Sequence, residues 1–368
     1  MNFVCDKDKC MGCMACVASC SQNAITIIDN LSSYNALINK ELCINCGACH
    51  RVCQVCNPLE LQSPIDWKQG WAIKNGIRAT SSSGGYATAI AEAFVRSGAV
   101  CSCYFADGEF RFKIAYTTKE LVEFSGSKYV KSNPIDMYNI VNKVLKEGEK
   151  CLVIALPCQI AGLKKYVDIK YQNLLYTIDL ICHGTPSPQL LDVYLKQHSK
   201  NLKECKNIRF RSKHKFGLLV DTDKNNDSGA EDSYTLAFLN CLSYTDNCYI
   251  CPYAKKERIS DLTLGDSWGT ELSMQERDKG ISIALVQTQK GEELLAKAEI
   301  SIQDVDIKRA IAANHQLRVP STKPRKRSSF FESIRRNKSF DFIVFKIYTK
   351  QYIKQVIKRI FPYFGIKL

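Results

Sequence analysis

The sequence predicts a multidomain protein of mixed α+β and α/β class, with a small cysteine-rich head, a mixed α/β body and a basic C-terminal helix. Ten of the 19 cysteines lie within the first 56 of the 368 residues. Continuous apolar strands then alternate with helical patterns, which is typical of a partly parallel sheet covered by helices. Residues 325–368 carry twelve lysines or arginines and two acids. From these changes we expect domains at 1–62, 63–318 and 319–368.

The head repeats one cysteine pattern, as CMGCMACVASC from residue 10 and as CINCGACHRVC from residue 43. The first residues show no basic segment followed by an apolar run, so we expect no signal peptide, and reduced thiolates rather than disulfides. Three thiolates spaced by two residues can each reach a different iron of a cubane cluster, and the fourth cysteine of each run then binds the other cluster. A zinc site is the alternative, but the duplicated triplet fits it poorly.

These spacings assign eight head cysteines to two [4Fe-4S] clusters. The first would be held by Cys10, Cys13, Cys16 and Cys53, and the second by Cys43, Cys46, Cys49 and Cys20. The head resembles the bacterial two-cluster ferredoxins, although the proline that usually follows the fourth cysteine is Ser21 in one run and Gln54 in the other. Cys5 and Cys56 are left over, and Cys56 could compete with Cys53 as a ligand.

Four more cysteines come from three separate parts of the body. Cys158 follows the apolar strand LVIAL, and Cys182 closes the strand LLYTIDLI, so both lie where strands of an α/β sheet end. A ligand crevice usually forms at such ends. The run CYIC adds Cys248 and Cys251 as a chelating pair. Together they could hold another iron–sulfur cluster or a zinc ion, the alternative being cysteines that only fill the core.

Two glycine-containing stretches precede or interrupt the helical patterns of the body, SSSGGYATA at 81–89 and GSKYVKS at 126–132. The first places hydroxyl groups and flexible backbone just ahead of a helix, which prepares a helix N-terminus for a phosphate group. A serine-capped helix without a ligand is its alternative, and a turn with a surface lysine is the alternative for the second. Neither stretch is a GxGxxG motif or a P-loop.

Six motifs in order make the body similar to the beta-subunit family of coenzyme F420 hydrogenases and dehydrogenases: SSSGG, GSKYV, PCQIAGLKKY, DLICHGTPSP, CYICPYA and DLTLGDSWG. The resemblance covers about residues 63–300. It implies an FAD in the body and a third [4Fe-4S] cluster beside it, held by Cys158, Cys182, Cys248 and Cys251. It also suggests candidates for flavin contact, which are Ser82, Ser83, Gly84, Gly85, Ser127, Lys128 and Tyr129.

Two departures from the family pattern bear on the substrate. The usual Gly-Thr before PCQ is Ala155-Leu156 here, and an aromatic residue often found in the GD-x-WG motif is Ser267. The substrate therefore need not be the deazaflavin for which the family is named.

The expected function is that of an iron–sulfur flavoprotein oxidoreductase, which exchanges electrons between a ferredoxin-like protein partner and a two-electron, small-molecule substrate. One alternative is an electron-transfer adapter whose substrate site belongs to a partner subunit, and another is a zinc-bound basic binding module. The cofactors would carry the reaction, so no catalytic acid or base is assigned. His183, next to a proposed ligand, is the most notable histidine.

The basic C-terminal segment predicts a linker from residue 319 and an amphipathic helix over 340–360. Its lysines share one helical face and its apolar residues another. Such a helix suits an anionic membrane surface or packs on the body, and nucleic acid binding ranks third because no recognition motif accompanies the charge. No run reaches the roughly 18 uncharged apolar residues of a membrane span. We therefore expect a cytoplasmic protein, or one peripheral to the inner face of the membrane. The residues concerned are Lys346, Lys350, Lys354 and Lys358 on one face, and Phe342, Phe345, Tyr348, Tyr352, Val356 and Ile360 on the other.

Overall fold

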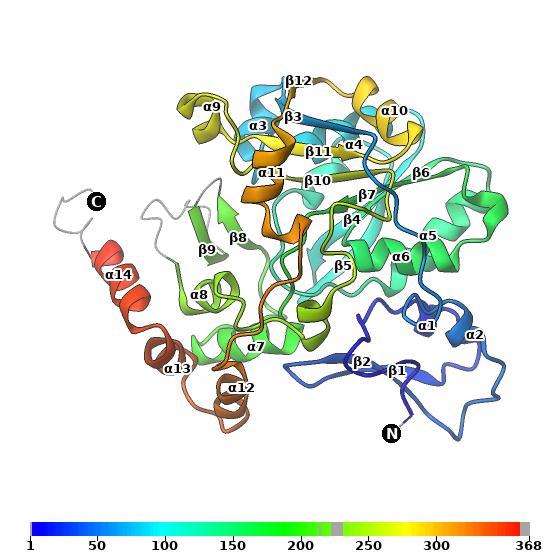
Figure 1. Cartoon of the computed structure of the whole chain (residues 1–368). Helices are drawn as coiled ribbons and strands as arrows, with labels where there is room; N and C mark the ends of the chain where they lie inside the picture. Colours follow the sequence, from blue (N-terminus) through cyan, green and yellow to red (C-terminus); the bar gives the residue numbers. More distant parts are fainter. Residues whose placement is uncertain (1, 213–214, 222–230, 361–368) are drawn as a thin grey trace.

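The computed structural model describes residues 2–212, 215–221 and 231–360. An eight-stranded mixed sheet forms its centre, in the order β12-β3-β11-β10-β7-β6-β4-β5 (Figure 1). Four neighbouring strands are parallel, namely β4 (Ala99–Ala106), β6 (Cys151–Ala155), β7 (Leu175–Leu180) and β10 (Leu262–Asp266). Antiparallel strands extend both sides: β5 (Glu109–Ala115) on one, and β11 (Ser282–Val286), β3 (Asp66–Ala72) and β12 (Ile300–Asp304) on the other. The expected sheet, parallel in part, is confirmed.

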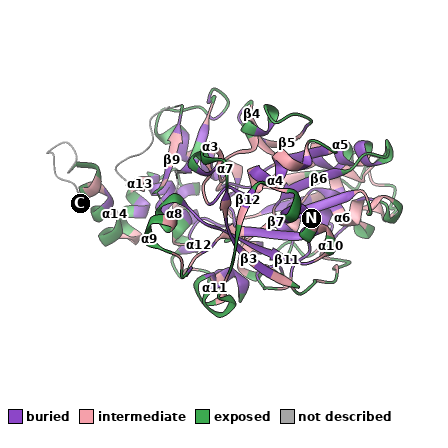
Figure 2. Ribbon diagram, turned by 90° about the horizontal axis from the view of Figure 1, so that it is seen from above, coloured by how far each residue is buried: buried purple, intermediate pink, exposed green. Residues whose placement is uncertain are grey.

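Helices cover both faces of this sheet, which explains why its central strands are apolar throughout. All five residues of β6 are buried, and they alternate between two cores: Val153 faces one core and Leu152 the other. The first face carries α5 (Ile135–Lys146) and α6 (Pro157–Tyr166), and the second carries α4 (Tyr86–Phe94) and α10 (Gln289–Lys297). Figure 2 shows the buried residues along the strands and the exposed ones on peripheral helices. Shorter elements around the sheet are α3 (Asn75–Thr80), α9 (Met274–Lys279), α11 (Ile307–Ala313), η1 (Glu120–Phe124), η2 (Ile169–Tyr171), η3 (Asp246–Ile250) and η4 (His315–Leu317).

The cysteine-rich head packs against α5 and α6 (Figure 1). It contains a two-stranded antiparallel sheet and two single-turn helices: β1 (Ile25–Asp29), β2 (Tyr34–Ile38), α1 (Ala15–Ala18) and α2 (Ala48–Arg51). Met11, Met14 and Ala15 of the head share one apolar core with Tyr138 and Ile160 of the body. The Tyr138 hydroxyl donates to the carbonyl of Cys13. The head therefore completes the core of the body rather than standing apart from it.

The C-terminal segment packs on a second group of elements beside the sheet. This group comprises α7 (Pro188–Gln197), the hairpin of β8 (Ile208–Ser212) and β9 (Lys215–Val220), and α8 (Ser233–Leu239). Phe330 and Phe331 of α12 (Arg327–Arg335) are fully buried there, as is Phe340, the first residue of α13 (Phe340–Ile347). The expected linker thus contains a packed helix.

The expected single helix over 340–360 is divided into α13 (Phe340–Ile347) and α14 (Thr349–Ile360). The break falls at Tyr348, whose φ and ψ are −125° and 47°. Next to it, the Thr349 hydroxyl donates to the Phe345 carbonyl at 2.9 Å and competes for the acceptor that a continuous helix would use. None of the helices in the described ranges is long and apolar enough to cross a membrane.

Gly162 in α6 lies directly against the Cys13 loop of the head. A Cβ at this position would lie 2.7 Å from the Tyr138 hydroxyl and 3.1 Å from the Cys13 sulfur. We expect Gly162→Ala to destabilise the protein by about 1–3 kcal/mol through overpacking and to displace the Cys13 loop. Urea unfolding and the iron content of the purified protein measure the two effects.

Gly76 in α3 provides the matched control, because a Cβ there would meet nothing within 4 Å. Gly76→Ala should raise the free energy of unfolding by about 0.5–1 kcal/mol, since alanine restricts the unfolded chain. Equal effects of the two substitutions would contradict the tight contact at Gly162.

Candidate cofactor cavity and cysteine groups

A cavity of about 340 Å³ lies at the carboxyl ends of the parallel strands. Its walls include Leu156 after β6, Cys182 after β7 and Asp266 at the end of β10, together with the start of α4. In open α/β sheets, ligands bind in the crevice outside these strand ends. The sheet sets the position of the cavity, and both strand ends and loops supply its lining side chains.

Six of the seven residues proposed for flavin contact line this cavity, namely Ser82, Ser83, Gly85, Ser127, Lys128 and Tyr129. The loops that carry Ser82 and Ser127 are joined, since the Ser127 amide donates to the Ser82 hydroxyl at 3.0 Å. Gly84 has a different place: a Cβ there would lie 2.4 Å from the Gly70 carbonyl oxygen and 2.5 Å from the Ser282 nitrogen. Gly84 therefore allows the loop to lie directly on β3 and β11.

Lys128 holds its own loop in shape. Its ammonium group donates to the carbonyls of Phe124, Ser125 and Gly126 at 3.0–3.1 Å. These three bonds use all three ammonium hydrogens. Burial lowers the pKa of Lys128, and the nearby Cys103 thiol opposes this shift. Lys128 thus shapes the cavity wall through the backbone of residues 124–126.

An aromatic wall with a partly buried ion pair forms another side of the cavity, and sequence reasoning identified only its Tyr129. The rings of Tyr129 and Phe238 stack with centroids 4.3 Å apart. Arg211 makes two bonds to Asp266, at 2.6 and 2.9 Å, and its guanidinium lies 5.8 Å from the ring centroid of Trp268. Asp266 belongs to the motif DLTLGDSWG, so that part of the signal was present, but nothing in the run RFRS pointed to Arg211.

The four body cysteines line a second, smaller cavity next to the first. These are Cys158 in the first turn of α6, Cys182 just after β7, Cys248 in η3 and Cys251 just after η3. Cys182 lines both cavities. Burial raises the pKa of Cys182 to about 12 and that of Cys251 to about 11. The Cys182 and Cys251 thiols are therefore protonated at neutral pH, and metal binding would release their protons.

Two buried cations line the same small cavity, and neither was singled out from the sequence. Arg258 is 1% exposed and contacts Asp179 at 2.7 Å. Lys131 is 4% exposed and donates to the Met11 carbonyl of the head at 3.0 Å. Burial raises the pKa of Cys251, and both cations oppose that shift. The positive charges of Arg258 and Lys131 favour the thiolate form of Cys251, and the thiolate is the form that binds metal.

The first head group is also assembled around one cavity, lined by Cys10, Cys13, Cys16 and Cys53. Cys5 lines it too, and its thiol hydrogen-bonds to Cys10 and Cys53, lowering their pKa values to about 6 and about 5. The Ala36 amide donates to the Cys10 sulfur at 3.5 Å. The exposed thiol of Cys56 donates to the Val4 carbonyl at 3.7 Å and lies beside Cys53.

The second head group lies nearer the surface. Burial raises the pKa of Cys49, and the nearby Cys43 and Cys20 thiols add to the shift. Cys46 is exposed. In the described part of the chain, no group of three or more His, Cys, Asp or Glu residues is arranged to hold a metal ion. A [4Fe-4S] cluster has a different requirement, because each of its four thiolates binds a separate iron atom.

Gln54 connects the first head group to the body cysteines. Its amide nitrogen donates to the Cys158 carbonyl, and its amide oxygen accepts from the Tyr253 hydroxyl. Gln54 is 3% exposed. The residue that replaces the usual ferredoxin proline thus joins head and body.

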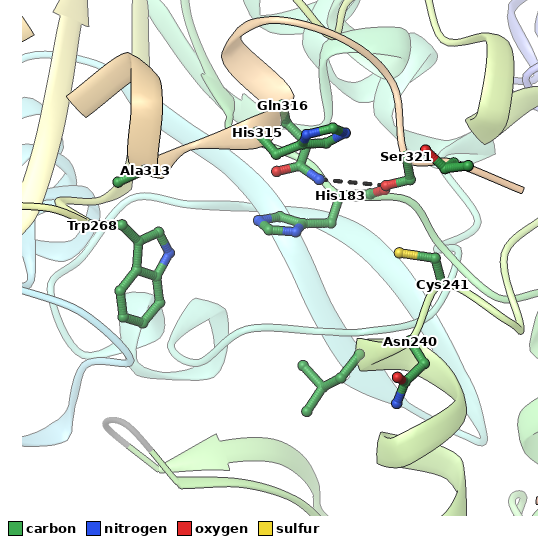
Figure 3. Close-up of a pocket in the computed structure, with 10 residues that line it drawn as sticks. His183, Asn240, Cys241, Trp268, Ala313, His315, Gln316 and Ser321 are labelled. Carbon is green, nitrogen blue, oxygen red and sulfur yellow. Dashed lines mark hydrogen bonds between the residues drawn. The ribbon is translucent and has the colours of Figure 1, made fainter. Parts of the chain in front are cut away.

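An outer pocket of about 510 Å³ opens beside the strand-end cavity of about 340 Å³, which is called the large cavity by contrast with the cysteine-lined one (Figure 3). The two share His183, Leu239 and Trp268. Figure 3 shows His183 and His315 on one side and Trp268 on the other. The His183 carbonyl accepts from the Ser321 hydroxyl at 2.7 Å. Burial lowers the pKa of His183, so its imidazole is neutral at neutral pH.

Comparison with known proteins places three segments of the chain. Residues 148–308 match the family model for the C-terminal part of the coenzyme F420 hydrogenase/dehydrogenase beta subunit, and residues 68–137 match the model for its N-terminal part. Residues 9–57 match a 4Fe-4S dicluster domain. No curated protein matches the chain.

Among solved structures, one similar chain comes from the xenon-derivatised F420-reducing [NiFe] hydrogenase complex of Methanosarcina barkeri. The two chains are 16% identical, and the match covers 69% of this chain and 91% of that one, with a TM-score of 0.45.

The family matches confirm the resemblance carried by the six body motifs and by the repeated cysteine runs. The chain belongs to the coenzyme F420 hydrogenase/dehydrogenase beta-subunit family, which is a family of oxidoreductases, and it carries a 4Fe-4S dicluster domain at its head.

Proposed function

We propose that the protein is an iron–sulfur flavoprotein oxidoreductase that passes electrons between a one-electron protein donor and a two-electron organic substrate. One observation carries this proposal: the proposed sites adjoin one another. Cys13 of the first head group lies against Gly162 of α6, and Gln54 contacts Cys158. Cys182, which is one of the four body cysteines, also lines the large cavity.

In this proposal the cysteines hold three [4Fe-4S] clusters. Buried thiols, amide donors such as that of Ala36 to Cys10, and the cations Lys131 and Arg258 suit thiolate ligands. Cys5 and Cys56 are the alternative ligands for the first set, because both lie beside Cys53. The ligand sets are Cys10, Cys13, Cys16 and Cys53; Cys43, Cys46, Cys49 and Cys20; and Cys158, Cys182, Cys248 and Cys251.

The large cavity would hold FAD. The start of α4 offers backbone amides for phosphate groups, with the hydroxyls of Ser82 and Ser127 beside it. The stacked pair Tyr129 and Phe238 suits a planar ring system. Bound there, a flavin would supply both hydride chemistry and single-electron exchange. The pair of Arg211 and Asp266 fixes the aromatic wall, and neutral His183 separates this cavity from the outer pocket, where the substrate would enter.

The electron donor would dock at the second head group. Cys46 is exposed there, and the neighbouring apolar side chains of Leu42 and Ile44 are 51% and 62% exposed. Exposed apolar side chains around a near-surface redox site suit a transient protein contact. This places donor and substrate at opposite ends of the proposed series of sites.

A second candidate function is an electron-transfer adapter, because the family is named for a subunit. The isolated chain would then bind its cofactors but turn over no small-molecule acceptor. Anaerobic assays with a low-potential electron donor and a panel of quinones, flavins and deazaflavins distinguish the two functions.

Replacing one body cysteine should remove one cluster. The purified wild-type chain should contain about twelve irons, and Cys182→Ser about eight, with flavin retained. Iron, sulfide and flavin quantitation after anaerobic purification measures this, and zinc in place of iron would support the basic binding module. Cys205→Ser is the control, because the Cys205 thiol donates only to the Asn201 carbonyl, at 3.2 Å. Twelve irons in Cys182→Ser would refute the body ligand set.

Filling the large cavity should exclude flavin without affecting iron. Ala87 in α4 lines this cavity, whereas Ala93 of the same helix lines a small pocket near α10. We expect Ala87→Trp to lose most of the flavin absorbance and Ala93→Trp to keep it, with iron unchanged in both. Full flavin content in Ala87→Trp would mean that the flavin binds elsewhere.

A further inference from the structure

The helices α13 and α14 expose a set of large apolar side chains. Phe342 is 59% exposed, Ile353 46% and Ile360 47%. Phe345 and Ile357 are also exposed. No described part of the chain covers these side chains, although α12 is packed through Phe330 and Phe331 and the start of α13 through Phe340. The apolar face at the end of the chain therefore needs an occupant.

The opposite face of α14 binds the body and fixes the orientation of the helix. Gln355 is 6% exposed and makes two bonds to Glu231, at 3.0 and 2.6 Å. Arg359 donates to the Glu231 carbonyl at 2.9 Å. With about 100° between successive residues, Ile353 and Ile357 lie about 160° from Gln355 around the helix. The apolar stripe is thus directed away from the body.

Lysines border this stripe and no unpaired acid accompanies them. Lys346 and Lys350 are exposed, and Lys350 is next to Ile357 around the helix. Lys354 is exposed as well, although Lys354 and Lys358 both lie near Glu231. The sole acid within residues 340–360 is Asp341, which pairs with His198 at 3.1 Å. The face therefore combines apolar side chains with positive charge.

We propose that this face binds the surface of an anionic lipid bilayer, with α14 lying in the plane of the interface. Interfacial helices combine an apolar stripe with lysines, and each lysine near an anionic surface adds to binding. The cores of protein interfaces, in contrast, are depleted in lysine. The helices are also too short or too polar to span a membrane in the described ranges, which agrees with a surface position.

Flotation of the full-length protein with vesicles tests the proposal. Wild type should bind vesicles of equal parts phosphatidylglycerol and phosphatidylcholine, and should bind pure phosphatidylcholine far more weakly. Ile353→Ser with Ile357→Ser should weaken binding by more than about 100-fold. Lys346→Gln with Lys350→Gln should weaken it about 30-fold, and added salt should weaken wild-type binding further.

Matched controls come from other exposed surfaces. Ile169→Ser changes an 85% exposed isoleucine on η2, and Lys143→Gln with Lys146→Gln removes two exposed charges on α5. Both controls should bind like wild type, and every variant should keep its iron content and circular dichroism. The proposal would be overturned if the wild-type protein bound neither type of vesicle. It would also be overturned if the isoleucine variants bound anionic vesicles as strongly as wild type. The first of these outcomes would leave a protein partner as the occupant.

Discussion

The contact between the Cys13 loop and the bare backbone of α6 is the constraint on which the arrangement of the protein depends. Gly162 leaves room for the Cys13 sulfur, and Tyr138, Lys131 and Gln54 each add a hydrogen bond across the same boundary. The head is small and its strands are short, so burial within it alone would stabilise it little. Sharing its core with α5 and α6 places the head in a single position.

Buried charged side chains lie at the boundary between the head and the body and in the wall of the large cavity. Burying an ion pair is costly unless its hydrogen bonds are complete, and such pairs stabilise a fold weakly. Arg258 with Asp179 and Arg211 with Asp266 are nonetheless placed beside the two cavities. Their positions therefore fit a role in setting the local electrostatic potential. Lys131 adds positive charge between the head and the body cysteines.

The sequence allowed the local features to be predicted and left the long-range ones out of reach. Cysteines at strand ends could be located because an apolar run that stops at PCQ or CHG marks the end of a buried strand. Gly84 could not be separated from Gly85, because the contact that excludes a side chain at Gly84 comes from β3 and β11. The same holds for Arg211 and Gln54, whose partners lie 55 and 104 residues away in the chain. The break at Tyr348, beside the bond from the Thr349 hydroxyl to the Phe345 carbonyl, could not be read from the regular spacing of the lysines.

Met11 of the head forms part of the wall around the four body cysteines. The folded chain therefore encloses this group on the side where the head lies, and Lys131 ties Met11 in place. Anything that entered the cysteine-lined cavity from this side would have to displace Met11 and break its bond to Lys131. The docked head thus acts as a cover for four thiols that belong to another part of the chain.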